Sequence, residues 1–69
     1  MNRLLKIKII EHYGTQTEFV RDLRSSVGLE MSEDRLSKLI CGRLKPRDHE
    51  KVIIAQKLSI TPEDVFKNQ

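Results

Sequence analysis

The central run of the chain is Ser32-Glu33-Asp34-Arg35-Leu36-Ser37-Lys38-Leu39-Ile40. Leu36, Leu39 and Ile40 lie three and four residues apart, so they share one face of a helix. The other side chains of the run are polar or charged and are left to face water or a binding partner. Ser32 is a good N-cap, and acids in the first turn suit the positive end of the helix dipole. We therefore expect a helix that begins after Ser32 and ends at Gly42.

A basic segment follows this helix. Residues 35–47 contain five basic side chains and no acidic one, namely Arg35, Lys38, Arg43, Lys45 and Arg47. Pro46 disfavours a helical conformation at the residue before it, so 43–47 is predicted to be a loop. A short helix that buries one side and leads into a basic loop is suited to reach into nucleic acid.

The segment before the central run is predicted to form two helices. The first covers residues 2–12, with an apolar side made of Leu4, Leu5, Ile7, Ile9 and Ile10. Gly14 ends it, because a residue without Cβ enters the left-handed conformation at little cost. Thr15 and Glu18 then fit a capping box that begins the second helix. That helix is expected to end somewhere in 24–27.

The connection to the central helix and the C-terminal segment are also predicted from local signals. Gly28 is expected to take a positive φ, and Leu29 or Met31 is expected to enter the core. Asp48 can cap a fourth helix with apolar positions at Val52, Ile54, Ala55 and Leu58. Thr61 and Pro62 begin a very short fifth helix, whose Val65 and Phe66 should fold back onto the core. The prediction is a single all-α domain of five helices over residues 1–69.

Length and composition bound the stability of this domain. A 69-residue chain buries only about 60% of the surface that it exposes when unfolded, so its stability is marginal. The single cysteine cannot form an internal disulfide, and burial in a homodimer would supply stability. The first and fifth helices are the candidate surfaces for that dimer. The net charge of +3 is compatible with a polyanionic partner.

Catalytic, metal-dependent and membrane functions are not expected. No Ser-His-Asp set or paired carboxylates suggest an active site, so we expect neither an enzyme nor a small-molecule substrate. Cys41 and His49 are too few groups for a metal, and no cofactor is expected; Cys41 is expected to be a small packed residue. No apolar run approaches the roughly 20 residues of a membrane span. One free cysteine and no export signal favour a cytoplasmic protein.

Three segments resemble the phage-repressor family of helix-turn-helix domains, the Cro/Xre or lambda-repressor-like fold. They are residues 15–23, 32–46 and 54–66, and their order and spacing carry the resemblance. It implies a compact five-helix lambda-repressor-like helix-turn-helix domain. This chain departs from the family in a lengthened turn at 24–31. Val20 and Ser59 also stand where alanine and glycine are commoner.

The resemblance implies roles in binding double-stranded DNA. The residues implied to read base edges in the major groove are Glu33, Asp34, Arg35, Ser37 and Lys38. The residues implied to hold phosphates are Gln16, Thr17, Arg43, Lys45 and Arg47. Acidic groups in such a set lower non-specific affinity and reject wrong bases. About five phosphate neutralisations predict a log–log salt slope of roughly −4 to −5.

Two functions stay open at this point. The first is a sequence-specific DNA-binding transcriptional regulator of phage or bacterial type, a repressor acting as a homodimer. The second is a protein-interaction module on the same fold, such as an antitoxin or a phage accessory protein, since the lengthened turn and the acidic helix start suit a docked partner. Simpler roles are also open: one is that Glu33 and Asp34 only complement the helix dipole, and another is that 43–47 only confers solubility.

Overall fold

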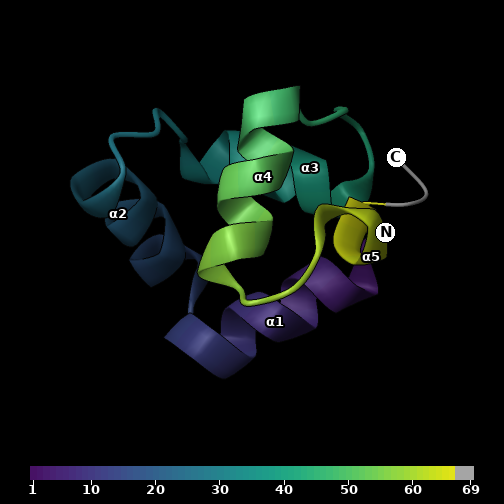
Figure 1. Ribbon diagram of the computed structural model, residues 1–69, viewed down its shortest axis with the longest axis horizontal. Coiled ribbons are helices and arrows are strands. Elements are labelled where there is room, and N and C mark those ends of the chain that lie inside the picture. The colour runs from purple at the N-terminus through teal and green to yellow at the C-terminus, as the bar shows by residue number, and fades with distance from the viewer. Residues whose placement is uncertain (67–69) are drawn as a thin grey trace.

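The computed structural model describes residues 1–66, and five helices and no strand are formed within them (Figure 1). The helices are α1 (Arg3–Tyr13), α2 (Gln16–Ser26), α3 (Glu33–Cys41), α4 (Asp48–Lys57) and α5 (Pro62–Phe66). The predicted all-α fold of five helices is confirmed, although residues 67–69 of the expected domain lie outside the described part. In Figure 1, α4 crosses in front of α3, α1 lies below, and α2 and α5 lie at opposite sides. None of these helices is long and apolar enough to cross a membrane.

A single hydrophobic core receives side chains from every helix. Side chains four residues apart are buried together: Leu5 with Ile9 on α1 and Phe19 with Leu23 on α2, all with 0% exposure. Val65 and Phe66 of α5 are each 3% exposed and close the core, as expected. Helices this short are stabilised mainly by the burial of such faces, because their intrinsic propensity alone does not hold them.

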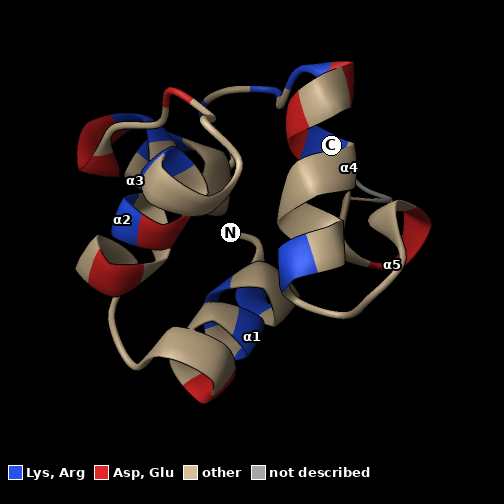
Figure 2. Ribbon diagram, turned by 60° about the vertical axis from the view of Figure 1, so that its left-hand side comes forward, with Lys and Arg blue, Asp and Glu red and all other residues tan. Residues whose placement is uncertain are grey.

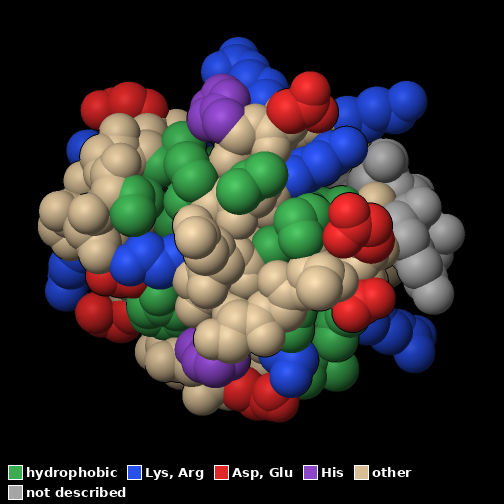
Figure 3. Space-filling model, in the orientation of Figure 1, with side chains coloured by type: hydrophobic (Ala, Val, Ile, Leu, Met, Phe, Trp, Pro, Cys, Tyr) green, Lys and Arg blue, Asp and Glu red, His purple; other side chains and the backbone are tan. Residues whose placement is uncertain are grey.

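Five predicted side-chain positions are wrong. Three apolar residues of α1 lie on the solvent side of the helix: Leu4, Ile7 and Ile10. Val52 on α4 is 53% exposed, because α4 turns Ile54 and Ala55 inward instead. Cys41 is also exposed rather than packed, since it is the last residue of α3 and lies beyond the buried Ile40. On the face in front of α4, hydrophobic side chains lie in separate places between charged ones (Figure 3).

The predicted N-caps of α2, α3 and α5 are confirmed. Each hydroxyl accepts the backbone N–H three residues on: Thr15 from Glu18 (3.2 Å), Ser32 from Arg35 (3.0 Å) and Thr61 from Asp64 (3.3 Å). The capping box of α2 is only half formed, because the Glu18 carboxylate pairs with Arg21 at 3.0 Å. These caps satisfy N–H groups that have no partner inside the helix.

The cap of α4 differs from the prediction. Asp48 is the first helical residue, and Arg47 occupies the N-cap position. The Arg47 backbone N–H donates to Oε1 of Glu50 at 2.8 Å, so the helix start is closed by a carboxylate rather than by the Asp48 side chain. Asp48 still lies where a negative charge suits the helix dipole.

Left-handed residues end α3 and follow α4. Gly42 has φ 81° and its N–H donates to the Leu39 carbonyl at 3.2 Å, which confirms it as the end of α3. Ser59 has φ 58°, the one positive φ of a non-glycine residue within 1–66. This is a position where the resembled family more commonly has glycine, and a side chain there carries a conformational cost.

The long connection between α2 and α3 is packed against the core. Gly28 has φ 66°, as expected, and the Leu29 N–H donates to the Leu23 carbonyl at 3.0 Å. Leu29 and Met31 are 6% and 2% exposed, so both enter the core. The connection is therefore anchored to α2 and to the core rather than being a free loop.

Asn2 joins three helices at the N-terminus. Its Oδ1 caps α1 by accepting the Leu5 N–H at 3.0 Å, and its backbone N–H donates to the Ile40 carbonyl at 2.6 Å. Its Nδ2 donates to the Val65 carbonyl at 2.6 Å. The start of α1 is thereby held against the ends of both α3 and α5.

Asp22 joins α1, α2 and α4. It accepts from the Tyr13 hydroxyl at 2.6 Å and pairs with the Lys57 ammonium at 3.1 Å. The hydrogen bond from Tyr13, followed by the one from Lys57, lowers the pKa of Asp22. Burial, reinforced by Asp22, raises the pKa of Tyr13 to about 12.

We predict that Asn2→Ala lowers the free energy of unfolding by about 2 kcal/mol, since it removes a cap of about 1 kcal/mol and a buried amide donor of similar value. Asn2→Ser keeps an oxygen that can cap α1 but loses the donor to Val65, so we expect about half that loss. Urea unfolding followed by circular dichroism measures both. An Asn2→Ser variant as stable as the parent chain would show that the bond to Val65 contributes nothing, and equal losses for the two variants would show the same for the cap.

Candidate nucleic-acid interface

The outer side of α3 carries four exposed polar residues. Leu36, Leu39 and Ile40 are buried at 0%, 0% and 3% exposure, which turns the opposite side of the helix to solvent. That opposite side carries what we call the outer row: Glu33, Asp34, Ser37 and Lys38. Four of the five residues predicted to read bases therefore lie together on the surface.

Two hydrogen bonds hold the outer row against the start of α2. The Thr17 hydroxyl donates to Oε1 of Glu33 at 2.7 Å, and the Ser37 hydroxyl donates to Oε1 of Gln16 at 3.2 Å. The two residues predicted to hold a phosphate at the α2 N-terminus thus lie beside the row. Because these bonds are exposed, they can be exchanged for bonds to a ligand at little cost.

A third contact lies within the row itself. Lys38 Nζ and Asp34 Oδ2 are 3.0 Å apart, one helical turn from each other, with side chains 48% and 78% exposed. An exposed pair at this spacing contributes only about 0.3–0.5 kcal/mol. The pair therefore orients Lys38 but is weak enough for Lys38 to exchange Asp34 for another partner.

Arg35, the fifth residue predicted to read bases, points elsewhere. Its Nε and Nη2 atoms each donate to a Glu50 carboxylate oxygen at 2.8 Å. The Glu50 side chain is 1% exposed and that of Arg35 is 24% exposed. The guanidinium beside Glu50 holds the pKa of that carboxyl below its usual value, although burial alone would raise it. The edge of the guanidinium formed by Nε and Nη2 is engaged by Glu50, so we leave Arg35 out of the DNA-contacting set.

Sequence reasoning missed Glu50 altogether, although a signal was present. Glu50 lies four residues before Ile54 and eight before Leu58, which places a carboxylate in the buried stripe of α4. A buried charge needs a partner of opposite sign, so this spacing predicts a nearby arginine or lysine. Arg35 could not be identified as that partner from the sequence, because the two residues are 15 positions apart.

The basic loop, residues 43–47, joins the end of α3 to the start of α4 (Figure 2). Arg43, Lys45 and Arg47 are exposed, whereas Leu44 is half-buried and Pro46 is buried. The Arg43 N–H donates to the Lys38 carbonyl at 2.9 Å, which folds the loop back over the last turn of α3. The alternation of anchored apolar and exposed basic residues gathers three positive charges at this end of α3.

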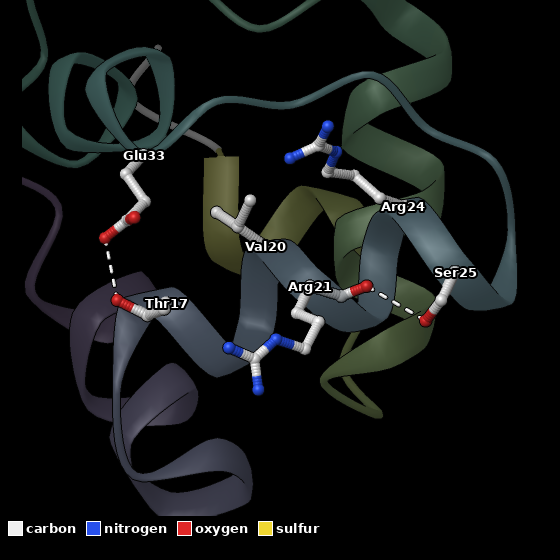
Figure 4. Close-up of a pocket in the computed structure, with 6 residues that line it drawn as sticks. All are labelled: Thr17, Val20, Arg21, Arg24, Ser25 and Glu33. Atoms are coloured by element: carbon white, nitrogen blue, oxygen red, sulfur yellow. Dashed lines mark hydrogen bonds between the residues drawn. The ribbon is translucent and has the colours of Figure 1, made fainter.

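Two further arginines flank the other end of α3. They line a shallow groove of about 480 Å³ on α2, together with Thr17, Val20, Ser25 and Glu33. In Figure 4, Arg21 and Arg24 extend from α2 on opposite sides of Val20, and Glu33 reaches down from α3 to Thr17. Arg21 and Arg24 were not among the residues expected from the sequence to contact DNA. The signal lies in their spacing, because both fall on the side of α2 opposite Phe19 and Leu23.

The described side chains offer no cluster of metal ligands on this surface. Within residues 1–66, no group of three or more His, Cys, Asp or Glu side chains is arranged to hold a metal ion. Comparisons with known proteins found no matching family model, no matching curated protein and no matching solved structure. The geometry of α2, α3 and the basic loop is therefore the basis for any functional proposal.

We predict that Arg35→Met destabilises the fold by about 3–5 kcal/mol, because it leaves the Glu50 carboxylate buried and unpaired. The double variant Arg35→Met/Glu50→Leu should recover most of that loss, since neither charge remains. Arg21→Met is the matched control: its pair with Glu18 is exposed, and its loss should cost at most about 1 kcal/mol. Thermal and urea unfolding measure all three. An Arg35→Met variant as stable as Arg21→Met would contradict the structural role of this pair.

We also predict acid-sensitive stability. The pKa of Glu50 is lowered in the folded state from 4.5, so its contribution is complete above that pH and is lost as the pH falls through the folded value. Asp22 acts in the same direction. Urea midpoints measured between neutral and acidic pH should therefore fall on acidification. Glu50→Gln should flatten that dependence, and an unchanged pH profile would refute the assignment.

Proposed function

We propose that this protein binds double-stranded DNA as a homodimer and represses transcription in a phage or bacterial setting, with α3 in the major groove. The observation that carries the proposal is the arrangement of charge around α3. The outer row is exposed, and cations flank it at both ends: Arg21, Arg24, Arg43, Lys45 and Arg47. A helix of this kind fits the width of the major groove, and its flanks meet the phosphates on either side.

The outer row supplies both donors and acceptors for base edges. Lys38 can donate to O6 and N7 of guanine, and Glu33 or Asp34 can accept from the amino group of cytosine. On binding, Lys38 would exchange its pair with Asp34 for a base. A carboxylate that finds no cytosine amino group is left against a polyanion, so the two acids penalise wrong sequences.

The flanks supply the sequence-independent part of the affinity. Gln16 and Thr17, at the amide end of α2, would hold a phosphate beside the outer row. The three cations of the basic loop and the two arginines of α2 would neutralise about five phosphates, which predicts a log–log salt slope of about −4.5. A homodimer would read two half-sites about one helical turn apart.

A protein-interaction module is the second candidate function. It is favoured by the two exposed carboxylates at the start of α3, one of which already accepts a hydroxyl bond from Thr17. A basic partner protein would complement them, whereas DNA would not unless each carboxylate met a suitable donor. The two functions differ in their response to DNA at low salt.

We predict binding to random-sequence duplex DNA in a mobility-shift assay, weakening steeply between low and moderate salt with a log–log slope near −4.5. The reason is the release of counterions from the phosphates that the flanking cations would neutralise. An absence of binding even at low salt would overturn the proposal and favour the protein-interaction module.

Single variants separate the two parts of the interface in the same assay. Arg43→Ala should weaken all sequences about equally and flatten the slope by about one unit, whereas Lys38→Ala should relax sequence preference. Lys6→Ala is the matched control, because it removes one exposed positive charge from α1, which contributes no residue to the outer row or its flanks. If it changed the slope as much as Arg43→Ala, the binding would reflect net charge rather than this surface.

A further inference from the structure

The outward side of α1 carries an apolar stripe that no other helix within residues 1–66 covers. Its members, which we call the α1 stripe, are Met1 (70% exposed), Leu4 (37%), Ile7 (53%) and Ile10 (52%). Leu5 and Ile9 of the same helix have 0% exposure, so the stripe lies on the side away from the core. Leu4, Ile7 and Ile10 recur every three residues along α1, and Met1 lies just before its N-cap. Apolar side chains gathered on one exposed side of a helix mark interaction surfaces.

Charges are distributed unevenly along this helix. Arg3, Lys6 and Lys8 belong to its first half, and Glu11 is the acid near its end. Glu11 pairs with Lys8 at 3.4 Å, and both side chains are partly exposed. The helix thus runs from a basic N-terminal half to an acidic residue on the same outward side as Ile7.

We propose that the α1 stripe binds a second copy of this chain, with the two α1 helices antiparallel about a two-fold axis. With Ile7 at the axis, Leu4 of one copy is level with Ile10 of the other. Arg3 is then level with Glu11 of the other copy, and the same contact repeats by symmetry. The patch is self-complementary in both apolar side chains and charge, as a two-fold interface requires.

The alternatives fit the charge pattern less well. A parallel pair would set Arg3, Lys6 and Lys8 beside their own copies and align the two helix dipoles unfavourably. An anionic membrane surface would attract the three basic residues but would repel Glu11, which lies on the same outward side of α1 as Ile7. α5 offers no comparable face, because its Val65 and Phe66 are buried.

The interface is small. An 11-residue helix is about 16 Å long, so a single pair of helices falls in the lower size class of specific interfaces. We therefore expect a dimer with a dissociation constant on the order of micromolar. This inference rests on the homodimer part of the proposed function and not on DNA binding, since the stripe shares no residue with the outer row or its flanks.

Sedimentation equilibrium of the full chain without DNA tests the proposal. The apparent mass should rise with concentration from 8.1 kDa toward twice that value. Ile7→Glu should weaken association on the order of tenfold or more, because two like charges would meet at the axis. Val52→Glu is the matched control, since Val52 on α4 is 53% exposed, as Ile7 is, and it should associate like the parent chain.

A charge exchange tests the antiparallel arrangement. Arg3→Glu and Glu11→Arg should each weaken the dimer, and the double variant should restore it, because the attraction between the two positions is re-formed with its signs reversed. Circular dichroism verifies that each variant stays helical. Failure of the double variant to recover would overturn the antiparallel pairing.

Two further results would overturn the proposal as a whole. One is a chain that stays monomeric at high concentration. The other is binding to vesicles of anionic phospholipid that is lost in Ile7→Glu, with no self-association. Neither result bears on the shift assay, so a monomer that binds DNA and a dimer that does not are distinguishable outcomes.

Discussion

The orientation of α3 depends on the ion pair between Arg35 and Glu50. Glu50 is the one charged side chain buried within residues 1–66, and it accepts from Arg35 on α3 and from the Arg47 backbone at the start of α4. A rotation of α3 that withdrew the guanidinium would leave a buried carboxylate unpaired, at a cost of several kcal/mol. The pair therefore adds to the burial of Leu36 and Leu39 in fixing which side of α3 faces outward.

That fixed side determines what the molecule offers to a partner. The outer row combines two carboxylates, a hydroxyl and the ammonium of Lys38, and the other cations of this surface lie at the two ends of the row. Affinity for a polyanion would come from the flanks, and discrimination from the centre. The α1 stripe is formed by residues outside this surface, so a second copy and DNA would contact different residues. In a chain this short, such association would also offset a marginal stability.

Most of the fold could be predicted because its signals are local. Ser32, Gly42 and Thr61 mark helix ends through bonds to residues at most four positions away, and those bonds are formed. Apolar spacing also found the buried positions of α3, namely Leu36, Leu39 and Ile40. The same spacing was wrong for part of α1, because it placed Ile7 on the side expected to face the core, and Ile7 is exposed. Whether an apolar residue faces the core depends on which helices pack around it.

The sequence by itself determined the five helices, their caps at α2, α3 and α5, and the exposed polar row of α3, since each follows from residues within one or two helical turns. Only the tertiary structure decided that Arg35 belongs to Glu50 rather than to a ligand, that Asn2 bonds to Val65 63 positions away, and that the α1 stripe is uncovered. The physical reason is that such contacts depend on the relative placement of whole helices. That placement is set by the packing of the entire core, and no short stretch of sequence contains it.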